Sequence, residues 1–134
     1  AALAAAGYSL LRSKRPQNLA GRVVLVTGAG GGVGRLCAVA FAKQGCSLVL
    51  WDLNEEALAA TRSAVQEAVP GTSVWTQRVD VANREAIFVA AKKAQENVAP
   101  LHVSVLVNNA GVMSGKPFLE SDDEQMLAVF GVNA

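Results

Sequence analysis

The sequence is poor in the residues that most often carry acid–base, metal and redox chemistry. Among its 134 residues are one histidine, His102, and two cysteines, Cys37 and Cys46, which form no Cys-x-x-Cys pair. Without clustered histidines or paired cysteines, a metal site is disfavoured and reduced structural thiols are expected. Tyr8 is the only tyrosine, and it lies near the start of the sequence. A single histidine outside any motif is more often part of the structure than a catalyst.

The chain also lacks an excess of charge of either sign. Twelve Lys and Arg against eleven Asp and Glu leave a net charge of +1, and no basic tail or face stands out. A nucleic-acid partner is disfavoured, because proteins of that class carry a concentrated positive patch. A hydrophobic fraction of 51% in a chain of this length predicts one globular unit with a buried core.

The apolar stretch at the start of the sequence is too short to span a membrane. It covers residues 1–11, whereas a spanning helix needs about 20 residues. The basic sequence RSKRP follows at positions 12–16, and the first residue is Ala rather than Met. We interpret residues 1–16 as the remnant of a membrane anchor, whose basic residues prefer the cytoplasmic side. The alternative is a terminal helix that packs on the domain at 17–134 or is disordered.

A strand, a glycine cluster and a helix in succession organise the rest of the chain. The β-branched run at 23–27 predicts a buried parallel strand, and residues 28–34 read GAGGGVG. Glycine lets main-chain N–H groups approach an anion with no Cβ in the way. A helix expected over 33–44 adds its N-terminal dipole and unpaired N–H groups. The sequence therefore predicts a phosphate-binding turn.

Strand and helix alternate along the remainder of the sequence. Further strands are expected at 47–52, 73–79 and 103–107, separated by helices of roughly 12 to 16 residues. Right-handed crossovers then give an α/β fold, a doubly wound parallel sheet with helices on both faces. The chain carries the first four strands and their helices, so the sheet is expected to be incomplete.

Capping residues and apolar spacing place the helices. Asn54 and Asn83 are expected N-caps, and Ser121 forms a capping box with Glu124 for the last helix. Residues at helical spacing are expected to line one face of each earlier helix. These residues are Leu36, Val39, Ala40 and Lys43, then Leu58, Thr61, Val65 and Ala68, then Ile87, Ala90, Ala94 and Val98.

The glycine spacing distinguishes between phosphate-binding loops. No Lys follows the cluster, which disfavours a nucleoside triphosphatase, and a Gly-x-Gly-x-x-Gly pattern begun at Gly28 would need a glycine where Val33 stands. The pattern Thr27-Gly28-x-x-x-Gly32-x-Gly34 fits instead. Between a strand and a helix, this pattern resembles the short-chain dehydrogenase/reductase family, whose fold is a Rossmann-type doubly wound parallel sheet.

Asp52 strengthens the resemblance. It ends the second expected strand, 24 residues after Gly28. In a dinucleotide-binding fold this position lies beside the adenosine ribose and accepts hydrogen bonds from its hydroxyls. A 2′-phosphate would meet like charge, and neither Gly31 nor Leu53 supplies a positive charge against it. NAD is therefore the expected cofactor, with NADP disfavoured.

Further residues match the family by position. Asp80-Val81 resembles the element that contacts adenine, although an Asp before a helix is often a turn residue. The sequence NNAG at 108–111 resembles the motif that stabilises the sheet and lies against the nicotinamide ribose. Asn133, 25 residues after Asn108, resembles the Asn of the catalytic tetrad, which orders a water in the proton relay. The resemblance implies cofactor contacts by Gly28, Gly30, Gly31, Gly32, Val33, Gly34, Asp52, Leu53, Asp80, Val81, Asn108, Ala110 and Gly111.

The rest of the tetrad is expected beyond Asn133, because Tyr8 cannot be the tyrosine of Tyr-x-x-x-Lys. The chain by itself is thus expected to hold the cofactor half and to be inactive. The sequences LVLWD at 48–52 and VSVLVNNAGV at 103–112 look like the membrane-associated retinol and 17β-hydroxysteroid dehydrogenases. That likeness implies a lipophilic alcohol or carbonyl substrate and a homo-oligomer when full length. It also implies the cytosolic face of the endoplasmic reticulum or lipid droplets, or otherwise the cytoplasm.

Two other functions remain open. A catalytically inactive nucleotide-binding or scaffold product of the same family would use these 134 residues as the whole protein. The family's sugar-nucleotide epimerase branch favours Gly-x-x-Gly-x-x-Gly spacing and is disfavoured by the NNAG sequence at 108–111.

Overall fold

The computed structural model describes residues 18–115 and 117–133. The segment 1–16, interpreted above as an anchor remnant, lies outside these residues. Within them, no helix has the length and apolar character needed to cross a lipid bilayer.

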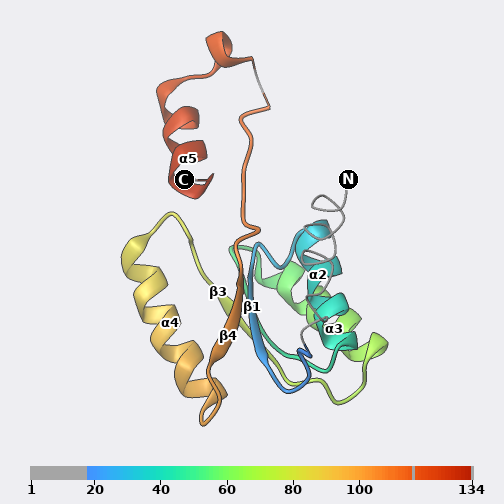
Figure 1. The fold of residues 1–134 in the computed structure, drawn as a ribbon. Coiled ribbons are helices and arrows are strands. Elements are labelled where there is room, and N and C mark those ends of the chain that lie inside the picture. The colour runs from blue at the N-terminus through green and yellow to red at the C-terminus, as the bar shows by residue number, and fades with distance from the viewer. Residues whose placement is uncertain (1–17, 116, 134) are drawn as a thin grey trace, which may run out of the picture.

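A parallel sheet forms the centre of the described chain. Its four strands are β1 (Val23–Thr27), β2 (Ser47–Asp52), β3 (Val74–Arg78) and β4 (Val103–Val107), in the spatial order β3-β2-β1-β4 (Figure 1). All three pairings are parallel. β1 is buried along its whole length, as expected for a central strand covered on both faces. The predicted α/β fold class is confirmed.

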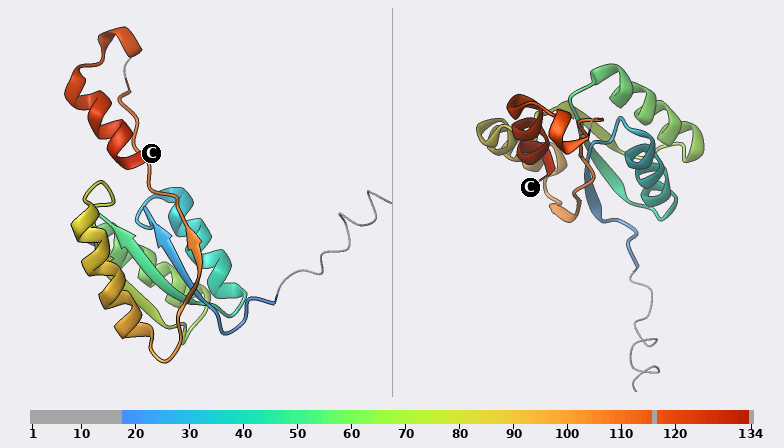
Figure 2. Two further views of the ribbon diagram at one scale, coloured as in Figure 1. Left: turned by 60° about the vertical axis from the view of Figure 1, so that its left-hand side comes forward. Right: turned by 90° about the horizontal axis from the view of Figure 1, so that it is seen from above.

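Helices cover both faces of the sheet. α2 (Gly32–Lys43) and α3 (Glu55–Ala68) lie on one face and α4 (Arg84–Val98) lies on the other (Figure 1). A 3-10 turn, η1 (Phe118–Glu120), precedes α5 (Asp123–Asn133). α5 lies beyond the carboxyl ends of the strands (Figure 2), and none of its described residues is buried.

The core divides into two clusters because successive strand residues point to opposite faces. Val24 and Val26 of β1 pack with α2 and α3, and Val23 and Leu25 pack with α4. Trp51 belongs to the α4 cluster and is only 4% exposed.

Two of the three expected helix caps are confirmed. Asn54 Oδ1 accepts from Ala57 N at 3.0 Å and Asn83 Oδ1 accepts from Ala86 N at 3.0 Å. The capping box at Ser121 is wrong, because α5 begins at Asp123 and its cap is the preceding aspartate. Asp122 Oδ1 accepts from Gln125 N at 2.8 Å, while the Ser121 hydroxyl donates to the Pro117 carbonyl.

The buried helix faces match the expected spacing in α4 and only partly in α3 and α2. Ala90, Ala94 and Val98 of α4 are buried, and Ile87 is partly buried against the same cluster. In α3 the expected Ala68 is exposed because the helix ends there. In α2 only Val39 of the expected residues packs against the core, where it is partly buried. The residues that α2 buries are Gly34, Ala38 and Ala42, whereas Leu36 is 71% exposed.

Candidate functional site

The site residues predicted from the sequence gather at the carboxyl edge of the sheet. The glycine turn follows β1, Asp52 ends β2, Asp80 follows β3 and Asn108 follows β4. Because all four strands are parallel, these four segments meet at one edge, which is where open α/β sheets bind ligands. Clefts along this edge share several lining residues.

The glycine turn is closed too tightly for side chains at two positions. Gly28 has φ +63°, and a Cβ there would lie 2.8 Å from Ala110 Cα. A Cβ on Gly34 would collide with the Gly28 carbonyl oxygen and lie 2.9 Å from Asn109 Nδ2. Glycine is thus required at position 28 by the backbone of Ala110, and at position 34 by the backbone of the turn itself.

The N-terminus of α2 is open to an external acceptor. Gly31 is the N-cap and offers no side chain, and the first turn carries no acidic residue. Arg35 N donates to Gly31 O at 2.9 Å, and the N–H groups of residues 32–34 precede this helical bond. They border a cleft of about 300 Å³ that is lined by Gly28, Gly31, Gly32, Val33, Gly34, Asp52, Asn109, Ala110 and Gly111. Such a terminus binds anions such as phosphate.

Asp52 borders the same cleft and is held by two backbone donors. Its Oδ2 accepts from Gly30 N at 2.8 Å, and its Oδ1 accepts from Asn54 N at 2.9 Å. A Cβ on Gly30 would lie 2.7 Å from Ala57 Cβ and 3.0 Å from Asp52 Oδ2. The glycine at position 30 therefore lets the turn, the carboxylate and the first turn of α3 meet.

Thr27 and Asn109 join the two halves of the site. The Thr27 hydroxyl donates to Val107 O at 3.4 Å and accepts from Asn109 N at 3.0 Å and Ala110 N at 3.1 Å. Asn109 Nδ2 donates to Thr27 O at 3.0 Å and to Gly28 O at 3.1 Å. Neither residue was among the predicted cofactor contacts, although both stand in the motifs that the sequence singled out. Their bonds show that they hold the glycine turn against the NNAG segment.

The predicted adenine-side residues also come together. A cleft of about 120 Å³ has Asp52, Leu53, Asp80 and Val81 in its wall. Asp80 Oδ1 accepts from Ala82 N at 2.9 Å, so this carboxylate also shapes its own turn, which was the simpler interpretation of the sequence. The cleft continues along Gly28, Ala110 and Gly111, which also line the cleft at the α2 N-terminus.

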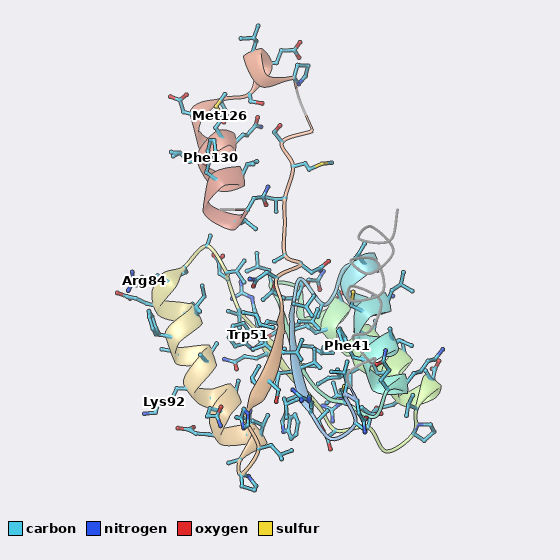
Figure 3. All side chains as sticks on the ribbon, in the orientation of Figure 1. Phe41, Trp51, Arg84, Lys92, Met126 and Phe130 are labelled. Atoms are coloured by element: carbon cyan, nitrogen blue, oxygen red, sulfur yellow. The ribbon has the colours of Figure 1, made fainter. Side chains whose placement is uncertain are left out.

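A third cleft of about 360 Å³ lies on the α4 side of the same edge, and its wall includes Trp51, Asn108 and Asn133. Figure 3 shows Trp51 between α4 and the strands, and its buried indole N–H has no acceptor among the described residues. Asn133 Oδ1 accepts from Val112 N at 2.9 Å and its Nδ2 donates to Val112 O at 2.9 Å. The predicted tetrad asparagine therefore anchors the end of α5 to the segment that follows Gly111.

The other candidate chemistries find no support in the described part of the chain. No group of three His, Cys, Asp or Glu side chains lies close enough to hold a metal ion among residues 18–115 and 117–133. Cys37 and Cys46 are both free thiols. Burial raises the pKa of the Cys46 thiol, and the nearby positive charge of Arg22 partly opposes this.

A parallel sheet, a glycine turn leading into a helix N-terminus, and a carboxylate at the end of the next strand define a Rossmann-type α/β protein. The profile of the family described as short chain dehydrogenase matches residues 22–134, and the chain belongs to this family.

Named relatives agree with this assignment. The chain is 42% identical over 126 residues to human epidermal retinol dehydrogenase 2, and the matched segment covers 94% of this chain and 40% of the relative. It is 42% identical over 120 residues to human estradiol 17-beta-dehydrogenase 11, and this matched segment covers 90% of this chain and 39% of the relative. The chain thus spans about two fifths of the length of these curated relatives.

A solved structure shows the same fold. The short-chain dehydrogenase/reductase from Burkholderia phymatum, crystallised in complex with NAD, matches with a TM-score of 0.79 and 39% identity, over 89% of this chain and 41% of that one.

Proposed function

We propose that this chain is the NAD-binding part of a short-chain dehydrogenase that interconverts a lipophilic alcohol and its carbonyl. The observation that carries the proposal is the pairing, across one cleft, of the open α2 N-terminus with the Asp52 carboxylate. The first group suits a pyrophosphate and the second suits a ribose diol.

The cofactor is assigned along the sheet edge in three parts. The N–H groups of residues 32–34 receive the pyrophosphate, because the helix dipole and their free donors favour negative charge there. Asp52 accepts from the adenosine ribose hydroxyls, with the adenine between Leu53 and Val81. The NNAG segment at 108–111 lies against the nicotinamide ribose, where Ala110 and Gly111 present little side chain.

The nicotinamide supplies hydride transfer when it is bound, and the residues of this chain bind and orient it. The Asp52 carboxylate also selects the cofactor. Its negative charge would oppose a 2′-phosphate, and it accepts from both Gly30 N and Asn54 N, which fixes its position. We therefore assign NAD rather than NADP.

The substrate class follows from the relatives, whose names give retinol and estradiol. Both are lipophilic alcohols, so we propose a retinoid or hydroxysteroid substrate. For the full-length protein we propose a homo-oligomer at the cytosolic face of the endoplasmic reticulum or of lipid droplets, with residues 1–16 near the membrane and residues 17–134 as the Rossmann domain.

A second candidate is a product that binds the nucleotide without turnover. The described residues contain no tyrosine, and the family's proton transfer needs one. The purified 134-residue chain should accordingly bind NAD and show no steady-state oxidation of retinol. Turnover by the pure chain would contradict the expectation that the catalytic tyrosine lies beyond Asn133.

Replacement of Asp52 tests the cofactor assignment. Asp52→Ala removes charged hydrogen bonds to the ribose, so NAD affinity should fall roughly 10- to 100-fold. The preference for NAD over NADP should narrow as well, because the repulsion of the 2′-phosphate is lost. Titration calorimetry with each cofactor at fixed ionic strength measures both effects.

The matched control for this test is Glu67→Gln, which removes one exposed negative charge from α3 outside the clefts. Its cofactor affinities should match the wild type. An unchanged ratio of NAD to NADP affinity in Asp52→Ala would remove the ribose assignment.

A further inference from the structure

Two carbonyl groups of the glycine turn accept hydrogen bonds from side chains that do not line the clefts described above. Thr61 of α3 is fully buried, and its hydroxyl donates to Ala29 O at 2.9 Å. The same hydroxyl accepts from Arg35 Nε at 3.1 Å. Arg35 Nη2 donates in turn to Gly30 O at 3.3 Å.

These contacts fix two consecutive peptide groups. A trans peptide is planar, with its C=O and N–H on opposite sides. In the peptide between Ala29 and Gly30, the carbonyl accepts from Thr61 while the N–H donates to Asp52 Oδ2 at 2.8 Å. In the next peptide, the Gly30 carbonyl accepts from Arg35 while Gly31 N–H donates to Gly28 O at 3.2 Å.

A continuous path of hydrogen bonds therefore runs from Arg35 through Thr61 and the 29–30 peptide to Asp52. Loss of the Thr61 hydroxyl would free that peptide to rotate, and Gly30 N–H would no longer be aimed at the carboxylate. Thr61 lies on the same buried stripe of α3 as Leu58 and Val65, where an apolar side chain would serve packing equally well. A hydroxyl at this position needs its own explanation.

We propose that Thr61 and Arg35 are positioning residues, which act through the 29–30 and 30–31 peptides to hold Asp52 in the orientation that selects NAD. The inference rests on the proposed function, because it assigns Asp52 to the ribose. Its consequence is that cofactor preference is set partly from α3, behind the glycine turn.

The test compares three variants for NAD and NADP affinity by titration calorimetry. Thr61→Val keeps the shape and removes the hydroxyl. NAD affinity should fall about five- to tenfold, the effect of losing the one hydrogen bond from Gly30 N to Asp52 that orients the carboxylate. The ratio of NAD affinity to NADP affinity should decrease as well. Thr61→Ser restores the donor, and both quantities should return to within about twofold of the wild type.

Thr72→Val is the matched control for stability. Its hydroxyl donates to Val69 O at 2.8 Å, just beyond the C-terminal end of α3. This variant loses one side-chain hydrogen bond, whereas Thr61→Val loses two, and its cofactor affinities should be unchanged. A purely structural role for Thr61 would make Thr61→Val and Thr72→Val alike in binding, or would leave Thr61→Ser as impaired as Thr61→Val. Either result would overturn the proposal.

Amide hydrogen exchange of Gly30 in the cofactor-free chain separates this inference from the proposed function. Gly30 N–H should exchange several-fold faster in Thr61→Val than in the wild type and Thr72→Val, because its bond to Asp52 is weakened. Equal exchange in all three would overturn the inference. A wild-type chain that binds neither cofactor would instead remove the proposed function, and the exchange comparison would still decide whether Thr61 orients the turn.

Arg35→Lys provides a second variant in case Thr61→Val does not fold. A lysine cannot donate to Thr61 and Gly30 O from one planar group. Faster exchange at Gly30 and a narrower cofactor preference are expected, and wild-type values for both would count against the path.

Discussion

The helices of the two sheet faces begin at the same edge of the sheet, yet their N-termini differ. α3 and α4 each begin with an asparagine whose side chain accepts from the third residue of the helix, and each has glutamate in its first turn. α2 begins with Gly31, which has no side chain, and its first turn contains no acidic residue.

This difference separates two helix termini that are capped by side chains from one that has no side-chain cap. In α3 and α4 the free N–H groups and the positive end of the dipole are satisfied by residues of the chain itself. In α2 the same groups border the cleft beside Asp52. Under the proposed function, the cofactor pyrophosphate supplies at α2 what Asn54 and Asn83 supply elsewhere.

The largest effect on stability and on NAD binding is expected when a side chain is added inside the glycine turn. In Gly34→Ala the new Cβ meets the Gly28 carbonyl oxygen and lies 2.8 Å from Ala29 Cα, and backbone cannot move aside as a flexible side chain can. We expect the free energy of unfolding to fall by about 3 kcal/mol and NAD binding to be lost. Urea denaturation and calorimetry measure the two effects.

Gly32→Ala is the control for that experiment, because no described atom lies within 4 Å of a Cβ at position 32. This variant should unfold at or above the wild-type urea concentration, since alanine favours the helix over glycine. Equal stability of Gly34→Ala and Gly32→Ala would show that the turn is looser than the structure has it.

A milder change gives the N-terminus of α2 a capping side chain, as α3 and α4 have. Gly31 has φ −72° and ψ 165°, and a Cβ there would lie 3.5 Å from Gly28 O, so Gly31→Asp fits and can cap the helix. Stability should rise by about 0.5 to 1 kcal/mol, a few tenths from the cap and the rest from the negative charge at the helix N-terminus. NAD affinity should fall at least about tenfold because the new carboxylate repels the pyrophosphate. Thermal unfolding and calorimetry follow the opposed changes.

Gly31→Asn separates the cap from the charge. It should stabilise α2 by the cap alone, about a few tenths of a kcal/mol, and weaken NAD binding less than Gly31→Asp does. If Gly31→Asp leaves NAD affinity at the wild-type value, the phosphate does not lie at this helix terminus.

The smallest effect is expected where a structural cap is removed. Asn83→Ala loses the bond from Ala86 N at the start of α4, which should cost about 1 kcal/mol of stability. NAD affinity should stay within about twofold of the wild type, because this cap satisfies the chain itself. A loss of affinity as large as that of Gly31→Asp would end the distinction between the two kinds of terminus.

The sequence predicts the elements whose signals are local. Alternation of apolar runs and helical stretches yields the four parallel strands, and Asn54 and Asn83 cap their helices as expected. The last helix shows the limit of this approach. Ser121 and Asp122 are both good caps, and their order along the chain does not say which one the backbone will use.

Contacts between distant parts of the chain were not predictable. Leu36 was expected on the buried face of α2 from its spacing, but α2 packs through Gly34, Ala38 and Ala42 and leaves Leu36 exposed. The bonds of Asn109 to Thr27 span 82 positions and that of Thr61 to Ala29 spans 32. A periodic pattern records which face of an element is buried, and it does not record which polar atoms meet there.

The Thr27 hydroxyl has a consequence for the order of folding. Its partners on Val107, Asn109 and Ala110 lie 80 to 83 positions along the chain. Contacts of such high sequence separation form slowly, because a long loop must close before they can form. The glycine turn therefore acquires its final shape only when β4 has joined β1. Under the proposed function, the ability to bind NAD would then report that the described sheet is complete.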